Sequence, residues 1–167
     1  IAPVVFESGL FALKGGTAIN LFLRDMPRLS VDLDLVFTDH RMPRAEALAA
    51  IDEAIRAARA RLARRGFKVQ AVSAADIGET RLLVQRDDLA VKIEVNTVIR
   101  GTVHPTQTLG LTAAASDALL ADLELPLLSS EDIYGGKLVA AMDRQHPRDL
   151  FDIMELFAHG GITPAIR

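Results

Sequence analysis

The sequence predicts an α+β protein in which a mixed β-sheet is flanked by helices. Two observations predict this class. Segments with alternating apolar residues recur through the first hundred residues, and segments with apolar residues at helical spacing lie between and after them. Half of the 167 residues are hydrophobic and a quarter are charged, which is ordinary for a globular chain. We expect a sheet-containing core over residues 1–128 and a helical C-terminal segment over residues 129–167.

The elements of the core are expected in a definite order. A strand over residues 11–14 enters a glycine turn, a helix follows over 17–24, and an alternating strand covers 31–37. A long helix with repeated Ala and Leu covers 43–65 and ends at Gly66, which suits the position after a helix C-terminus. Strands are expected over 67–73, 81–85 and 89–98, and the last two form a hairpin.

The end of the chain changes in character after about residue 100. Residues 104–112 are expected to form a loop or an edge strand, and 122–128 the last strand. The polar run Ser129-Ser130-Glu131-Asp132 predicts the start of a helix that continues through 133–142. Pro147 suits the first residue of a second helix, which extends to about residue 158.

The composition excludes several classes of function. The chain has no cysteine, so it has neither disulfides nor thiolate zinc sites. It has no apolar run near eighteen residues and no signal-peptide pattern, so we expect a cytoplasmic protein without a membrane partner. Because the sequence begins at Ile1 without a methionine and stops just after a helical pattern, we expect the natural protein to extend beyond both ends.

Charge is unevenly distributed along the chain. The net charge of −3 argues against a generally basic nucleic-acid binder. The stretch from Arg41 to Lys68, however, contains eight basic residues and three acidic ones, which gives it a net charge of +5. This stretch is either a basic surface for a phosphate backbone or the solvated face of an amphipathic helix.

The run Lys14-Gly15-Gly16-Thr17 has the pattern of a phosphate-binding turn. Gly15 and Gly16 can take positive φ and let backbone N–H groups approach an oxyanion. The helix expected from Thr17 would add the dipole of its N-terminus.

Three acidic residues on two predicted strands could hold a metal ion. Asp32 and Asp34 share one face of an alternating strand, with Cα atoms about 6.5–7 Å apart. Glu94 lies on the polar face of a second alternating strand and is the natural third carboxylate. If the strands are neighbours, these acids could surround Mg²⁺ or Mn²⁺ and polarise a triphosphate. The alternative is that each acid simply lies on the wet face of an antiparallel sheet.

Four stretches resemble motifs of the AbiEii/AbiGii toxin family of nucleotidyltransferases, within the DNA-polymerase-β-like superfamily. The first two run from Leu13 to Asn20 and from Arg28 to Asp34. The last two are Lys137–Arg144, which resembles the family's lysine motif, and Pro147–Asp152, which resembles its R-D-x-x-D motif. The matches occur in the expected order along most of the chain, which makes them more specific than the D-x-D pattern alone.

This resemblance implies a polymerase-β-like nucleotidyltransferase fold and a set of site residues. Asp32, Asp34 and Glu94 would bind metal, although the superfamily often has aspartate at the third position. Lys137 would reach the triphosphate, and Asp149 would be a functional acid near the nucleotide. The nucleotide-binding residues would be Lys14, Gly15, Gly16, Thr17, Ser30 and Lys137. Read alone, Lys137 is a solvated helix residue, and Arg148 could pair with Asp152 at i,i+4.

The implied activity is Mg²⁺-dependent transfer of a nucleoside monophosphate from a triphosphate to an acceptor. The resemblance implies an RNA acceptor, a tRNA 3′ end, and the role of toxin in a toxin–antitoxin or phage-defence system. It also implies a cognate antitoxin, a winged-helix repressor. The alternative is a catalytically inactive nucleotide-binding module that regulates a partner.

Overall fold

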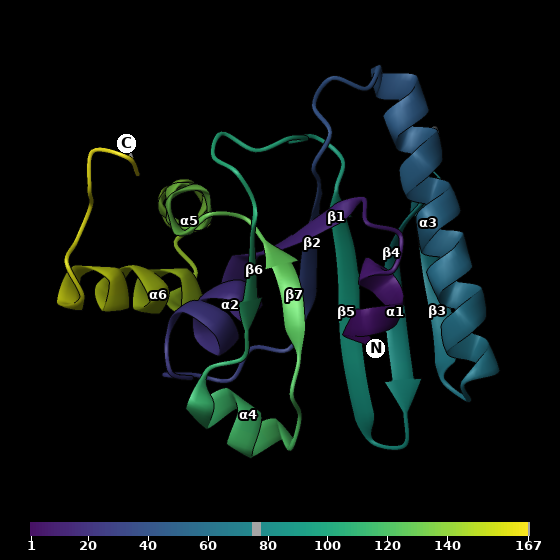
Figure 1. The fold of residues 1–167 in the computed structure, drawn as a ribbon, viewed down its shortest axis with the longest axis horizontal. Coiled ribbons are helices and arrows are strands. Elements are labelled where there is room, and N and C mark those ends of the chain that lie inside the picture. The colour runs from purple at the N-terminus through teal and green to yellow at the C-terminus, as the bar shows by residue number, and fades with distance from the viewer. Residues whose placement is uncertain (75–77, 167) are drawn as a thin grey trace. The chain divides into compact units, whose positions relative to one another are not determined.

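The computed structural model describes residues 1–74 and 78–166 and divides the chain into two compact units (Figure 1). The first unit consists of Ile1–Leu13 and Val31–Thr102. The second consists of Lys14–Ser30 and the chain from Val103 onward. The boundary expected between residues 128 and 129 falls inside the second unit and stays a prediction of domain organisation.

The first unit is a mixed sheet with two helices. Its strands run in the order β3-β4-β5-β2-β1. The sheet is mixed because β2 pairs with β5 in parallel, whereas β4 pairs with β3 and β5 antiparallel. Its elements are α1 (Ala2–Phe6), β1 (Phe11–Lys14), β2 (Leu33–Phe37), α3 (Arg44–Arg64), β3 (Lys68–Ala74), β4 (Gly78–Arg86) and β5 (Leu89–Asn96).

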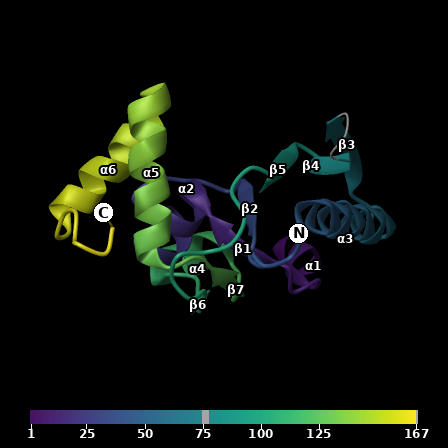
Figure 2. The ribbon, with the colours of Figure 1, turned by 90° about the horizontal axis from the view of Figure 1, so that it is seen from above.

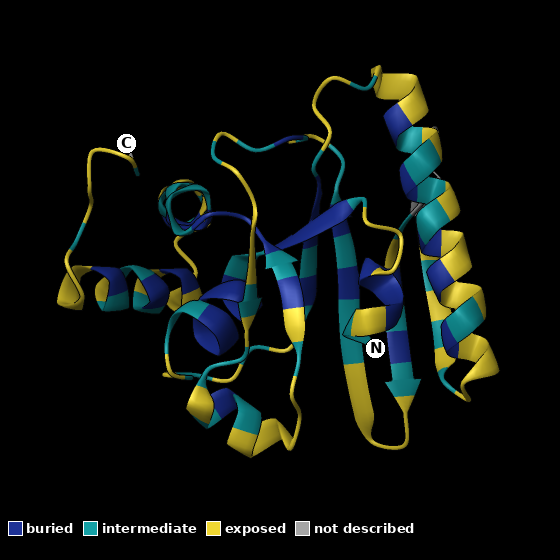
Figure 3. Cartoon of the chain, viewed as in Figure 1, coloured by how far each residue is buried: buried dark blue, intermediate teal, exposed yellow. Residues whose placement is uncertain are grey.

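Apolar periodicity explains how this unit packs. In α3 the buried residues recur every three or four positions, at Ala47, Ile51, Ile55, Ala58 and Leu62, so they form one stripe along the helix (Figure 3). Figure 2 shows α1 and α3 on the same side of the strands of the first unit. The core of the unit lies between that stripe and the sheet, and each fully buried Leu or Ile contributes about 1.5–3 kcal/mol.

The second unit is mainly helical. Two short strands pair antiparallel in it, and its two longest helices contact each other. Its elements are α2 (Gly15–Ala18), a π-helical turn (Ile19–Leu23), β6 (Gln107–Gly110), α4 (Ala113–Leu119), β7 (Glu124–Leu127), α5 (Ser130–Arg144) and α6 (Pro147–Ala158).

The expected elements are present, with shifted ends. The helix expected from Thr17 begins at Gly15 and continues as a π-helical turn, and β2 begins at Leu33, so Asp32 precedes the strand. The helices α1 and α4 were not expected, because five and seven residues are too few to show helical periodicity. Within the described residues, no helix combines the length and apolar character needed to cross a membrane.

Candidate functional site

Two of the predicted acids are neighbours in the first unit. Asp34 of β2 and Glu94 of β5 are register partners in the parallel pair, so their side chains leave the same face of the sheet. Asp32 lies just before β2, and its Oδ1 accepts a hydrogen bond of 3.1 Å from the backbone N–H of Lys92. The strands that carry the acids are thus adjacent, as a shared metal site requires.

Glu94 has two cationic partners. Arg81 contacts its Oε1, and the Nζ of Lys92 lies 3.1 Å from its Oε2. Burial raises the pKa of Glu94, but the hydrogen bonds from Arg81 and Lys92 outweigh burial and hold the pKa below its ordinary value. Glu94 is therefore a carboxylate at neutral pH. Across the described residues, no group of three Asp, Glu, His or Cys side chains is arranged to hold a metal ion. The three-acid metal site stays a prediction.

The predicted phosphate-binding turn forms one cluster in the second unit. Gly15 has φ +76°, which favours glycine, and Lys14 precedes it in an extended conformation. A Cβ on Gly16 would lie 2.7 Å from Nη2 of Arg28 and 2.9 Å from Oγ of Ser30, so a larger residue does not fit without displacing its neighbours. The hydroxyl oxygens of Thr17 and Ser30 are 3.3 Å apart.

Asp152 binds two of the side chains that surround this turn. Its side chain is fully buried, and it accepts two hydrogen bonds from Arg28, of 2.8 Å from Nε and 2.6 Å from Nη2. Asn20 Nδ2 donates both to Asp152 Oδ1 at 3.1 Å and to the backbone oxygen of Gly16 at 2.9 Å. One carboxylate therefore orients the two side chains that contact Gly16, which makes Asp152, Arg28 and Asn20 positioning residues for the turn.

Lys137 joins Asp152 to Asp149, the acid in the first turn of α6. Its Nζ lies 3.0 Å from Asp149 Oδ1 and 3.0 Å from Asp152 Oδ2, and only 7% of the lysine is exposed. Arg144 also binds Asp149, with its Nε 2.6 Å from Oδ2. Burial raises the pKa of Asp149, but the hydrogen bonds from Arg144 and Lys137 outweigh burial and lower the pKa to about 2.

The same balance acts on Asp152. Burial raises its pKa, whereas hydrogen bonds from Arg28 and Asn20 and the charge of Lys137 bring it below the ordinary value. Both aspartates are therefore ionised at neutral pH, and their charges are balanced inside the second unit by Lys137, Arg28 and Arg144.

Two details of the sequence interpretation are wrong. Lys137 is buried and paired, not solvated. Asp152 pairs with Arg28 and Lys137 in place of Arg148, because a buried carboxylate needs several donors and a guanidinium fork supplies two at once. The roles of Arg28 and Asn20 were missed, although both lie inside the motif stretches. The signal in the sequence that could have identified them is an amide residue four positions after Gly16 and an arginine two positions before Ser30.

The predicted site residues thus form two groups. Asp32, Asp34 and Glu94 belong to the first unit, and the second unit brings together Gly15, Gly16, Thr17 and Ser30 next to the network of Lys137 and Asp149. Carboxylate oxygens are suited to a hard divalent cation, and a glycine turn is suited to a phosphate. Together these are the two chemical parts that nucleotide transfer needs.

Comparison with known proteins agrees with this chemistry. The chain resembles the MenT4 nucleotidyltransferase toxin of Mycobacterium tuberculosis H37Rv with a TM-score of 0.65 at 21% sequence identity, which confirms the predicted fold. That match covers 93% of this chain and 53% of MenT4, so the chain spans about half the length of its structural relative. No curated protein sequence matches it. Residues 2–167 match the family described as nucleotidyl transferase AbiEii toxin, Type IV TA system. The chain therefore belongs to the AbiEii family of nucleotidyltransferase toxins.

Proposed function

We propose that the full-length protein is a metal-dependent nucleotidyltransferase toxin that moves a nucleoside monophosphate from a triphosphate to RNA. The observation that carries this proposal is the register pairing of Asp34 with Glu94, with Asp32 two residues ahead of Asp34. Family membership adds the reaction class.

Asp32, Asp34 and Glu94 suit Mg²⁺ or Mn²⁺ because hard divalent cations prefer carboxylate oxygens. In this proposal Asp32 and Asp34 hold the ion, and Glu94 joins them by releasing Arg81 or Lys92. When bound, the ion would lower the pKa of the acceptor hydroxyl and neutralise charge on the leaving pyrophosphate.

The second unit would bind the triphosphate. The backbone N–H groups of Gly15, Gly16 and Thr17 lie at the start of α2, where the helix dipole favours an anion, so in this proposal they donate to phosphate oxygens. Lys137 would contact the phosphates by exchanging one of its two aspartate partners for a phosphate oxygen. Asp149 would then keep the lysine oriented through the bond of 3.0 Å that joins them.

An RNA acceptor, which we propose to be a tRNA, fits the basic end of α3. Some of the positive charge there is neutralised within the unit, since Arg56 pairs with Asp52 and Arg61 with Glu7. Arg64, Arg65 and Lys68 are exposed where the helix ends and β3 begins. Such residues can bind a phosphate backbone without reading its sequence. We further propose a cytoplasmic location and a winged-helix antitoxin encoded beside the toxin.

The alternative function is regulatory nucleotide binding without transfer. The pairing of Glu94 with Arg81 and Lys92 favours it, because those cations occupy the carboxylate that would complete the metal site. In that case the glycine turn binds a nucleotide, and Asp32, Asp34 and Glu94 take no part in a transfer reaction.

The decisive experiment is a labelling assay. The full-length protein is incubated with total RNA, Mg²⁺ and each of four labelled triphosphates, beside Asp34→Asn. Removing a carboxylate that would hold the ion should lower the rate by several powers of ten and leave the fold intact. The matched control is Asp88→Asn, which removes an exposed acid from the turn between β4 and β5 and should keep full activity.

Label in RNA of tRNA size with the wild type and Asp88→Asn, but not with Asp34→Asn, would support the proposal. Equal label with Asp34→Asn would indicate a contaminating enzyme. Nucleotide binding without label in any RNA would favour the regulatory module.

A further inference from the structure

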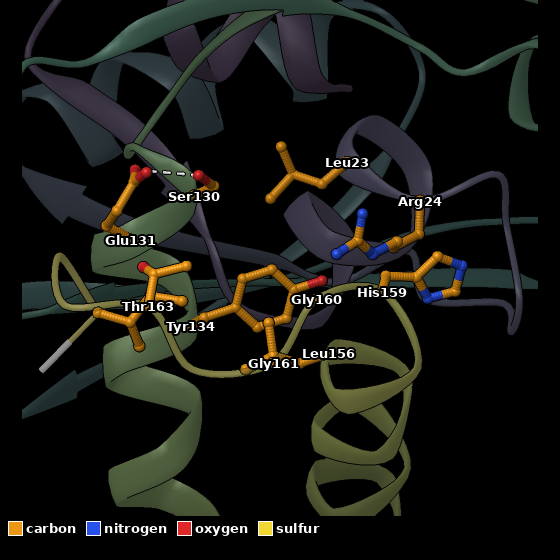
Figure 4. Close-up of a pocket in the computed structure, with 11 residues that line it drawn as sticks. Leu23, Arg24, Ser130, Glu131, Tyr134, Leu156, His159, Gly160, Gly161 and Thr163 are labelled. Atoms are coloured by element: carbon orange, nitrogen blue, oxygen red, sulfur yellow. Dashed lines mark hydrogen bonds between the residues drawn. The ribbon is translucent and has the colours of Figure 1, made fainter.

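A pocket of about 210 Å³ lies in the second unit between the start of α5 and the end of α6 (Figure 4). Leu23 and Arg24 line it from the end of the π-helical turn, Tyr134 from α5, and Leu156 and His159 from α6. The remaining wall comes from the start of α5 and the segment after α6: Ser130, Glu131, Gly160, Gly161, Thr163 and Ile166. None of the predicted catalytic or nucleotide-binding residues lines this pocket.

Two polar groups of the pocket are buried without an acceptor for their protons. Among the residues that the structure describes, neither the Nε–H of Arg24 nor the O–H of Tyr134 has a hydrogen-bond acceptor. Tyr134 is only 2% exposed, so its hydroxyl is not compensated by bulk water. Leaving such a group unpaired costs about 1–3 kcal/mol, which indicates that the pocket is built to hold something that pairs with it.

Arg24 is the cation beside the Tyr134 hydroxyl. Its guanidinium carbon lies 5.6 Å from the centre of the Tyr134 ring. Glu131 also lines the pocket, but its carboxylate accepts a hydrogen bond of 2.9 Å from Ser130 and is turned away from Arg24 (Figure 4). Two acids of α6 act on Tyr134: Asp152 is already engaged by Arg28, Asn20 and Lys137, and an oxygen of Glu155 lies 3.9 Å from Nδ1 of His159.

The tyrosine hydroxyl acts here as a donor. Burial raises the pKa of Tyr134, the charges of Asp152 and Glu155 add to that shift, and the charge of Arg24 and a hydrogen bond from its guanidinium oppose it without reversing it. At neutral pH the pocket therefore presents an O–H and a guanidinium N–H, and both need an acceptor.

We propose that this pocket is a second binding site that takes an oxyanion, the phosphate or carboxylate group of a small molecule. The Nε–H of Arg24 and the Oη–H of Tyr134 donate to its oxygens, and Leu23 and Leu156 contact the part of the ligand that carries the group. A charged acceptor strengthens both hydrogen bonds, because bonds to ions are about twice as strong as bonds between neutral groups. This site does not depend on nucleotide transfer.

Binding of an anion at this site can be measured in the full-length protein by isothermal titration calorimetry. We would titrate inorganic phosphate, and separately acetate, against chloride at equal ionic strength and follow the heat of binding.

Saturable change with phosphate or acetate is the expected result, and the anion that saturates first identifies the chemical group. Arg24→Gln should weaken binding at least about tenfold, because it removes a charge-assisted hydrogen bond. Arg86→Gln, which removes an exposed arginine at the end of β4, is the control and should bind like the wild type. As a second measurement, the saturating anion should raise the melting temperature of the wild type more than that of Tyr134→Phe. No saturable change with either anion, or equal binding by Arg24→Gln, would overturn the proposal.

Discussion

Neutralising Asp152 should be among the most damaging single changes in this protein. Asp152→Asn keeps the size of the side chain but removes its charge. It also places an amide N–H₂ among donors from Arg28, Asn20 and Lys137, which contact the carboxylate at 2.6–3.1 Å. At least one of those donors loses its acceptor. The carboxylate is fully buried, so water cannot replace the lost bonds.

The expected loss of stability follows from the burial of the ion pair between Asp152 and Arg28. The side chain of Asp152 is 0% exposed and that of Arg28 is 16% exposed, so the carboxylate of this ion pair is fully buried and its guanidinium is partly buried. Removing one partner of a buried pair costs about 3–5 kcal/mol. Lys137 keeps Asp149 as a partner, which limits the damage, and we expect about 3 kcal/mol. For a domain of this size that loss lowers the melting temperature by about 6–12 °C.

Urea unfolding followed by circular dichroism at neutral pH tests this prediction. The matched control is Asp143→Asn, which neutralises an exposed acid of α5 and should change the free energy of unfolding by less than about 0.5 kcal/mol. High salt should not abolish the difference, because buried pairs are screened little. A free energy of unfolding for Asp152→Asn within about 1 kcal/mol of the wild type would refute the reasoning.

Two further predictions concern the glycine turn and acid stability. Gly16→Ala should weaken triphosphate binding about tenfold or more, because its Cβ would lie 2.7 Å from an Arg28 group that Asp152 holds in place. Calorimetry beside Gly136→Ala, an exposed α5 position with open space at its Cβ, checks this, and equal affinities would contradict it. For Asp149 the folded pKa of about 2 lies below the unfolded value of 3.8, so its stabilisation is present above about pH 4 and is lost as the pH falls toward 2. Urea midpoints measured across that range should fall steeply for the wild type and less for Asp149→Asn, and parallel curves would count against this assignment.

Local pattern in the sequence was enough to predict most elements of the fold. Alternation identified β2 and β5, and helical spacing identified α3, because the buried face of each element repeats within a few residues. The helix starts at Ser129 and Pro147 were also correct, since caps act over three residues. The short helices α1 and α4 lack enough residues to show a period.

The sequence by itself also predicted several residues of the candidate site. The glycine turn, the two aspartates and the lysine were identified as motifs, and the family assignment confirms the class of protein they indicate. The sequence did not identify the residues with which the site residues pair. Asp152 meets Asn20 and Arg28 across 132 and 124 residues of sequence, and no local rule predicts such contacts.

Only the tertiary structure decided how the charges are balanced. Burial removes water from Lys137, Asp149 and Asp152, and each must then find protein groups to replace it. Which groups are available depends on how distant segments pack: the π-helical turn and the loop before β2 bring Asn20 and Arg28 to α6. The same packing leaves Arg24 and Tyr134 buried side by side without acceptors among the described residues. A sequence pattern gives the residue types of a site, whereas desolvation and long-range packing select the bonds those residues make.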